Sequence, residues 1–233
     1  MKTRIATALL LVFFSGCSVL KPAIPGTGII QSENRQVDFF DKVHLAGFGN
    51  VNVYSGDSPS VCITTDENLL AHVDTWVENG RLKIKPRTKI RPKSGLTIDI
   101  TAPQLTAAHI SGAGDLNIVD HSGDYLELSI SGAGTLKANG FVNDINASIS
   151  GAGDVHLKDL AANNVNVRIS GSGNAYVFAN ESIEAKVSGA GDVVCYGNPT
   201  HVNQTISGAG NFTMRDAPPL GNYAFGGNAS ARR

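Results

Sequence analysis

Apolar and polar residues alternate on both sides of a short corner that recurs through the second half of the chain. The corner reads SGAG, or SGSG in one copy, and successive copies begin 20, 19, 20, 18 and 19 residues apart. The copies start at Ser111, Ser131, Ser150, Ser170, Ser188 and Ser207. This alternation predicts short strands that each bury one face, and no part of the repeats has the period of an α-helix.

The regular spacing predicts a repeat architecture. A leucine-rich repeat would show its Leu and Asn pattern, which is missing, and a propeller blade would need roughly twice this period. We therefore predict an all-β chain that forms a single-stranded, right-handed parallel β-helix. Its coils would have about 19 residues and stack about 4.8 Å apart, and an N-terminal segment would cap them.

Each corner contains two glycines, which we expect to turn the backbone sharply because glycine adopts positive φ without a steric penalty. They are Gly112, Gly114, Gly132, Gly134, Gly151, Gly153, Gly171, Gly173, Gly189, Gly191, Gly208 and Gly210. A polar column follows them and consists of Asp115, Thr135, Asp154, Asn174, Asp192 and Asn211. Its side chains can bond corner N–H groups and one another, and no two carboxylates are adjacent. Both features are interpreted as architectural.

The N-terminus has the pattern of a bacterial export signal. Residues 1–16 combine a basic start, an apolar run and small residues before Cys17. The sequence FSGC resembles the lipobox of bacterial lipoproteins, with Phe14 where Leu is commonest, and this resemblance implies that Cys17 is lipidated. Ser18, a residue other than Asp, implies sorting to the outer membrane, facing the periplasm or the cell surface. The alternative is an ordinary signal with a chance cysteine.

The rest of the chain divides by composition and pattern. We predict a lipidated tether over 17–36, a single β-helix domain over 37–216 and a C-terminal tail over 217–233. Within the domain, 106–216 carries the SGAG repeats, while 37–105 forms degenerate first coils and a cap.

The predicted cap rests on three local patterns. LAGFGNVNV from Leu45 aligns with ISGAGDLNI from Ile110, which indicates that the β-helix begins there. A short helical turn within 66–77, followed by an Asn-Gly turn at 79–80, would close the open end of the stack. Cys62 and Cys195 belong to coils too far apart for a disulfide, so we predict two buried free thiols.

The segment RLKIKPRTKIRPK places a cation at every second residue. The cations are Arg81, Lys83, Lys85, Arg87, Lys89, Arg91 and Lys93. In a straight strand all of them would share one face, a candidate anion-binding surface for lipid headgroups, lipopolysaccharide phosphates or acidic glycans. The structural alternative is an edge strand whose charges and prolines prevent aggregation. Nucleic acid is not expected, because the chain is exported and the segment lacks interleaved aromatic residues.

An enzyme is the alternative class of function, because some parallel β-helix proteins are polysaccharide lyases or hydrolases. Asp154 and Asp192 would lie about 9.6 Å apart, near the upper limit for an inverting glycosidase pair. Four histidines fall at different repeat positions and are expected in solvated loops: His109, His121, His156 and His201. No nucleophile elbow, zinc pattern or cofactor motif occurs. Three or more carboxylate, Arg or Lys side chains converging in one groove would favour the enzyme.

The order FDKVHLAGFGNVNV, ENLL, NGRLKIKP, LTIDITAPQL and serial SGAGD units resembles the head-GIN domain family over about 39–215. This is a domain of unknown function, labelled as an auto-transporter adhesin and found in secreted and lipid-anchored bacterial proteins. The resemblance implies a β-helix and brings no known activity, cofactor or catalytic residue. We therefore expect a cell-envelope protein, held to the membrane by its N-terminal lipid, with a non-enzymatic role in surface interaction, adhesion or structure.

Overall fold

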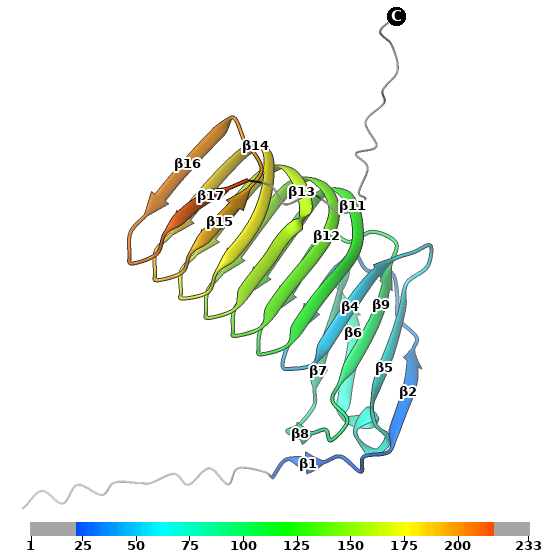
Figure 1. Ribbon diagram of the computed structural model, residues 1–233. Coiled ribbons are helices and arrows are strands. Elements are labelled where there is room, and N and C mark those ends of the chain that lie inside the picture. The colour runs from blue at the N-terminus through cyan, green and yellow to red at the C-terminus, as the bar shows by residue number, and fades with distance from the viewer. Residues whose placement is uncertain (1–21, 217–233) are drawn as a thin grey trace, which may run out of the picture.

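The computed structural model describes residues 22–216, so Cys17, the predicted signal peptide and the predicted tail lie outside the described residues. The described chain winds into a β-helix of about 5 turns (Figure 1). All strands of the SGAG region pair in parallel. They are β10 (Ala107–Ile110), β11 (Asp115–Ile130), β12 (Thr135–Ile149), β13 (Asp154–Ile169), β14 (Ala175–Val187), β15 (Val193–Tyr196), β16 (His201–Ile206) and β17 (Phe212–Arg215). The predicted fold class is confirmed.

Each residue before a corner lies beside its equivalent in the next coil. Ile130, for example, pairs with Ile110 on one side and with Ile149 on the other. The long strands bend midway, and the register between β11 and β12 shifts after Ile118. Each long strand therefore contributes one segment before its bend and another after it.

The interior is filled by columns of inward-facing apolar side chains. Leu126, Ile145 and Val165 stack in register, and each is at least 97% buried because its exposed fraction is 0%, 2% and 3%, respectively. Burying such a side chain fully contributes about 1.5–3 kcal/mol. Successive residues of a strand point to opposite faces. The residues before and after each inward-facing residue therefore point outward, and they form rows on the outer surface.

The N-terminal region contains β1 (Ile24–Pro25), β2 (Ile30–Arg35), β3 (Lys42–Leu45), β4 (Asn50–Ser55), β5 (Ser60–Asp66), β6 (Val73–Glu78), β7 (Arg81–Pro86), β8 (Ile90–Arg91) and β9 (Thr97–Ala102). β3 and β4 form the first coil, and Leu45 pairs with Ile110 as predicted. β9 then adds to β4, and β7 adds to β3, again in parallel. Beyond them β5, β2 and β6 pair antiparallel, which ends the regular winding.

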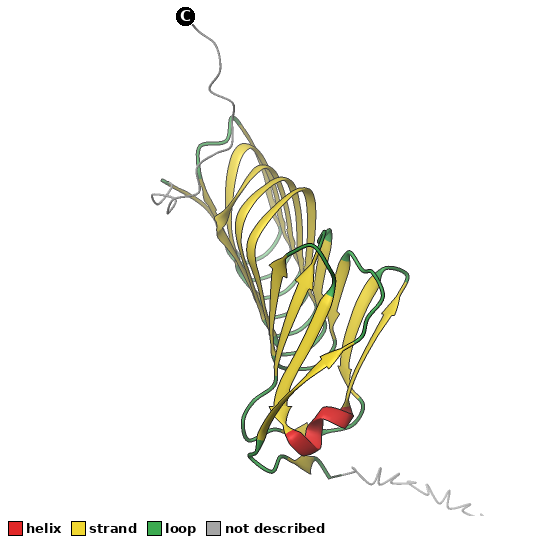
Figure 2. Cartoon of the chain, turned by 90° about the vertical axis from the view of Figure 1, so that its right-hand side faces the viewer, coloured by secondary structure: helices red, strands yellow, loops and turns green. Residues whose placement is uncertain are grey.

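The short 3₁₀ helix η1 (Glu67–His72) lies at the N-terminal end of the stack (Figure 2). Leu69 and Leu70 are buried there, so the helix covers apolar side chains that the first coil would otherwise expose. Asn79 and Gly80 both have positive φ, 53° and 70°, as a tight hairpin turn requires. The helical turn and the hairpin were both predicted. Within residues 22–216, no helix is long and apolar enough to span a membrane.

The predicted tether is wrong over its second part. Residues 24–35 include β1, which pairs with β8, and β2, which pairs with β5. β2 reads IQSENR and is exposed along nearly its whole length. The sequence therefore carried no alternation that would mark this segment as a strand.

The corner glycines are needed for a reason different from the predicted one. None of them has φ between +20° and +160°. Instead, a Cβ on Gly151 would overlap the carbonyl oxygen of Gly132 in the preceding coil, and the other SGAG glycines meet equivalent backbone atoms. The corners stack so closely that Ala152 N–H donates to Gly132 C=O at 2.9 Å. Glycine is required because no side chain fits between stacked corners.

The two described cysteines are unpaired, as predicted, but only one is buried. Cys195 is fully buried, and this burial raises the pKa of its thiol to about 11. Cys62 lies on the outer side of β5 and is half-buried, which corrects the expectation that both thiols are enclosed.

Candidate functional site

The basic segment does not form one straight cationic face. β7 ends at Pro86, and the chain then bends so that Ile90 and Arg91 pair with β1 in a separate two-stranded sheet. Lys83 forms an ion pair with Glu78 and lies 5.8 Å from the centre of the Trp76 ring. The hypothesis of seven cations on one face is therefore wrong.

Arg87 is also neutralised. Its guanidinium donates to Asp74 at 2.5 Å, and this bond, with the charge of Arg87, holds the pKa of the Asp74 carboxyl below its usual range. The edge-strand alternative fails for β7, because this strand lies between β3 and β6 and has no free edge. β7 is thus an inner strand, and its cation Lys83 is paired with Glu78.

Four cations of the segment are exposed and make no ion pair with an acid in the part of the chain that the structure describes: Lys85, Lys89, Arg91 and Lys93. We call these residues the basic cluster. Arg81, the remaining member of the predicted set, is half-buried on β7.

Asp66 fixes the loop that carries the end of the basic cluster. Its side chain is fully buried and accepts hydrogen bonds from the backbone N–H groups of Gly28 at 2.5 Å, Lys93 at 2.8 Å and Ser94 at 3.2 Å. Burial alone would raise the pKa of this carboxyl, but the three donors outweigh burial and lower the pKa. An ionised Asp66 therefore joins the segment after β1 to the segment after β8.

The polar column beside the corners has the architectural role predicted for it. Asp154 accepts from the backbone N–H of Asn174 at 2.8 Å, and Asp192 accepts from that of Asn211 at 2.8 Å. Between them, Asn174 accepts from the N–H of Asp192 at 3.0 Å. These carboxylates tie successive coils together, which accounts for their position without catalysis.

The histidines are not all solvated. His121 is only 4% exposed at the bend of β11, and burial lowers its pKa, which corrects the sequence prediction. His156 stacks on Tyr176 with ring centres 4.8 Å apart. His109 meets His44 of the preceding coil edge to face, with ring centres 4.6 Å apart.

His44 is the most perturbed of these histidines. Its Nε2 lies 2.8 Å from the Ser111 hydroxyl, and the cations of Arg81 and Lys83 are close. Burial first, and then repulsion from His109, Arg81 and Lys83, lowers the pKa of His44 to about 4. The ring is therefore neutral at pH 7. A Ser–His pair alone is an incomplete nucleophilic site, and no acid hydrogen-bonds His44 among the described residues.

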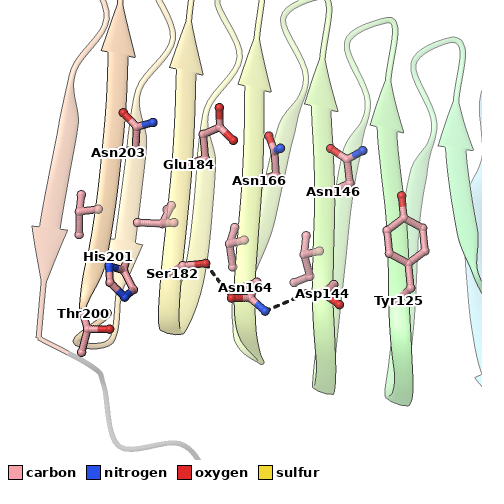
Figure 3. A pocket seen from close by; sticks show the side chains of 14 residues that line it. Tyr125, Asp144, Asn146, Asn164, Asn166, Ser182, Glu184, Thr200, His201 and Asn203 are labelled. Atoms are coloured by element: carbon pink, nitrogen blue, oxygen red, sulfur yellow. Dashed lines mark hydrogen bonds between the residues drawn. The ribbon is translucent and has the colours of Figure 1, made fainter.

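A shallow groove of about 790 Å³ crosses the faces of β11, β12, β13, β14 and β16 after their bend (Figure 3). Two rows of outward-facing side chains line it. The first row contains Tyr125, Asp144, Asn164, Ser182 and His201, which are register partners on successive strands. The second row contains Asn146, Asn166, Glu184 and Asn203. Both rows run along the β-helix axis, at right angles to the strands.

Hydrogen bonds fix the middle of the first row. Asn164 Nδ2 donates to Asp144 Oδ1 at 2.8 Å, and Ser182 Oγ donates to Asn164 Oδ1 at 2.7 Å (Figure 3). The second row is less constrained: Asn146 makes one long contact, 3.4 Å, with Arg168, and Glu184 forms an ion pair with Lys186. Tyr125, at one end of the groove, is 43% exposed. The groove therefore has a rigid side and a side with free hydrogen-bonding capacity.

The groove presents mainly hydrogen-bonding side chains. Amides and hydroxyls both donate and accept, so the two rows can pair with many ligand hydroxyls. Asp144 and Glu184 lie two coils and two strand residues apart, or about 12 Å, which exceeds the roughly 6.5–9.5 Å of an inverting glycosidase pair. No Lys or Arg lines the groove, so three catalytic-type charges do not converge there. By the criterion set from the sequence, the binding role is favoured.

No metal site supports a different chemistry. Within residues 22–216, no three His, Cys, Asp or Glu side chains are grouped so that they could hold an ion. The residues of the groove come from five strands and one loop residue, Thr200, and His201 is the one polar member that the sequence analysis considered.

The groove and the Asp66 site were missed for different reasons. On each strand the two rows of the groove lie two residues apart, and they recur at the same polar positions of successive repeats. Aligning these outward positions in the sequence would have shown the columns of Asp, Asn and Ser. Asp66 has no repeat equivalent, and its backbone donors lie 27 to 38 residues away in sequence. No local pattern could have found it.

Comparison with known proteins agrees with this architecture. A crystal structure described as a putative adhesin from Bacteroides fragilis superposes with a TM-score of 0.68 at 23% identity, covering 83% of this chain and 100% of that chain. One described as a putative lipid binding protein from Parabacteroides distasonis gives 0.51 at 20% identity, with 83% and 100% covered. At these identities the likeness shows the fold alone. No curated protein is similar enough to count as a relative.

The sequence profile described as "Putative auto-transporter adhesin, head GIN domain" matches residues 39–199. This span includes the N-terminal strands from β3 onwards and most of the SGAG coils. It also includes the basic cluster and most of the groove. The chain therefore belongs to the head GIN domain family of adhesin-like proteins.

Proposed function

We propose that this protein is a lipid-anchored, adhesion-like component of the cell envelope that binds a glycan chain, without enzymatic activity, in the groove between the rows that start at Tyr125 and Asn146. The observation that carries the proposal is the pair of polar rows, which repeat from coil to coil across five strands in the first row and four in the second. The adhesin description of the family supports the surface-interaction role.

A linear glycan suits this groove because both are periodic. Coils recur about 4.8 Å apart, so a polymer lying along the axis meets the same kinds of side chain at each step. Elongated solenoid proteins commonly bind extended ligands on such repeated surfaces. Tyr125 offers an aromatic face at one end, and the amides of Asn146 and Asn203 lie farther along.

Charge selects among glycans. Asp144 lines the groove, and the other acid there, Glu184, already forms an ion pair with Lys186. No Lys or Arg is among the lining residues, so the groove offers no cation to an acidic chain and favours a neutral one. The anionic partners expected from the sequence do not suit this site. Among residues 22–216, the candidate surface for such partners is the basic cluster.

Lipid anchoring is proposed from the sequence alone. Cys17 follows the small residues of FSGC, and Ser18 directs the proposed lipoprotein to the outer membrane, facing the periplasm or the cell surface. The non-enzymatic role is supported by the separation of Asp144 from Glu184. The structural roles of Asp154 and Asp192 support it as well.

The test is a glycan-array screen followed by calorimetry on the best neutral ligand. The variant Tyr125→Ala/Asn146→Ala/Asn203→Ala removes one aromatic face and two amides from the groove. We expect it to bind at least tenfold more weakly, since each hydrogen bond contributes about 0.5–1.5 kcal/mol.

The matched control is Tyr54→Ala/Asn50→Ala/Asn117→Ala, which removes the same side chains from the strand segments before the bend. It should bind like the wild type. Equal losses in both variants, or no neutral glycan bound at all, would contradict the proposed site.

A further inference from the structure

The structure ties the start of the described chain to the basic cluster. β1 pairs in parallel with β8, so that Ile24 N–H donates to Lys89 C=O at 2.9 Å and Gly26 N–H donates to Arg91 C=O at 2.9 Å (Figure 1). The described chain therefore begins beside Lys89 and Arg91. This end of the molecule also carries η1, and it is opposite to the end formed by β16 and β17 (Figure 1).

The side chains of the basic cluster point outward at this end. Ile90 is 93% buried because its exposed fraction is 7%, and Lys89 and Arg91, on either side of it in an extended segment, are exposed. Lys93 and Lys85 are exposed as well. The Lys93 ammonium contacts only the backbone carbonyl of Thr27, at 3.5 Å. The charges of the cluster are thus available to an external anion.

The cluster is held in a fixed position. Asp66 bonds the backbone of Gly28 on one side and of Lys93 and Ser94 on the other, and Gly26 packs so closely on this carboxyl that a Cβ there would overlap it. Ile24 and Ile90 are adjacent and pack on the core. The start of the described chain and the part of the basic cluster from Lys89 to Lys93 are therefore tied together.

Cys17 precedes Ile24 by seven residues in the sequence, a length that spans at most about 25 Å even when fully extended. If Cys17 carries the lipid, the basic cluster is kept within this distance of the headgroups. We propose that the basic cluster is a membrane-contact surface for anionic lipid headgroups, which seats this end of the β-helix on the bilayer. This inference rests on the proposed lipid anchor. With this end of the β-helix on the membrane, the glycan groove on β11, β12, β13, β14 and β16 would extend away from the bilayer.

Two acids on the neighbouring strand do not neutralise this surface. Asp74 and Glu78 on β6 already pair with Arg87 and Lys83, so they do not compete for the four cations of the cluster. Glu67, in the first turn of η1, is exposed and follows Asp66 directly in the chain. The membrane-contact surface is therefore smaller than the segment predicted from the sequence, and consists of Lys85, Lys89, Arg91 and Lys93.

The experiment uses the chain from Ser18 to Arg233, which lacks the lipid but keeps every described residue. Co-sedimentation is measured with vesicles of phosphatidylcholine alone and of phosphatidylcholine with phosphatidylglycerol. We expect binding only to the anionic vesicles, and weaker binding at higher salt because charges on the surface are screened. Changing Lys85, Lys89, Arg91 and Lys93 to Gln should weaken this binding at least tenfold.

The matched control changes four exposed cations of the coils, Lys137, Lys158, Arg168 and Lys186, to Gln. It alters the net charge by the same amount and should retain at least half of the binding. An equal loss in both variants would show a general charge effect and overturn the inference, as would equal binding to neutral and anionic vesicles. Soluble glycerol phosphate is added as a competitor: complete displacement at millimolar concentration would identify a phosphate pocket instead of a membrane surface.

Failure of the inference and failure of the proposed function are separable. The vesicle assay contains no lipidated Cys17 and no glycan, so it does not depend on either. Thermal unfolding of both variants checks that the fold is intact. Glycan binding should be the same in the wild type and in the variant of the basic cluster, because the groove lies on other strands.

Discussion

Gly151 lies directly on Gly132, one coil below it. The Gly132 carbonyl accepts a hydrogen bond from Ala152 N–H at 2.9 Å, and there is no room for a Cβ on Gly151 above the same carbonyl. The same contact joins Gly171 to Gly151 and Gly189 to Gly171. The corners therefore form one tightly packed column along the β-helix.

The variant Gly151→Ala should destabilise the protein, although alanine is compatible with the backbone conformation. Its methyl group would force two coils apart, and overpacking of this kind typically costs about 1–3 kcal/mol. Chemical denaturation measures the loss. Ala152→Ser, at the neighbouring exposed position, is the control and should be nearly neutral. If Gly151→Ala is as stable as the wild type, the corners are not packed as closely as the structure indicates.

The corner shows what the sequence could and could not reveal. Its period predicted the β-helix and the pairing of Leu45 with Ile110, because register follows from repetition. The reason for the glycines was mistaken, since a sequence does not distinguish a need for positive φ from a need for space. Pro86 was visible in the basic segment, yet the bend after it depends on the pairing of β8 with β1, about 65 residues away in the chain.

Asp66→Asn should lower the melting temperature by several degrees. The amide nitrogen cannot accept the hydrogen bonds that Lys93 and Ser94 donate to Oδ2, so both N–H groups would lose this acceptor. Circular dichroism on heating measures the change, with Asp57→Asn, on the β4–β5 turn, as the control. A melting temperature equal to that of the wild type would show that the hydrogen bonds of Asp66 do not stabilise the fold.

The same carboxyl gives an acid-side prediction. Because the folded pKa of Asp66 lies below its ordinary value of 3.8, its ionised form stabilises the fold above that pH, and this stabilisation is lost as pH falls through the folded pKa. The difference in stability between the wild type and Asp66→Asn should therefore shrink below pH 3.8. A difference that stays constant from neutral to acidic pH would show that ionisation of Asp66 does not contribute.

Cys17→Ser should release the protein from the membrane fraction. If Cys17 is the lipidated residue, its acyl chains supply most of the attachment, and the basic cluster alone is too weak to hold the protein on washed membranes at high salt. Fractionation of cells that express the two forms measures the difference, and Cys62→Ser is the control. Equal recovery of Cys17→Ser and the wild type in salt-washed membranes would show that another feature anchors the chain.

His44 should make the protein less stable in mild acid. Its pKa is about 4 in the folded protein against 6.5 for an unperturbed histidine, so the unfolded chain binds the proton first and stability falls as pH drops from 6.5 towards 4. The loss should be about 1–2 kcal/mol, because the ring is only half-buried and solvent screens part of the effect. Denaturation at pH 7.5 and pH 4.5 measures it. His44→Gln should show a smaller difference between the two pH values, whereas His156→Gln, outside the His44–His109 contact, should behave like the wild type. A pH dependence unchanged in His44→Gln would assign the acid sensitivity to other groups, with the buried His121 the next to test.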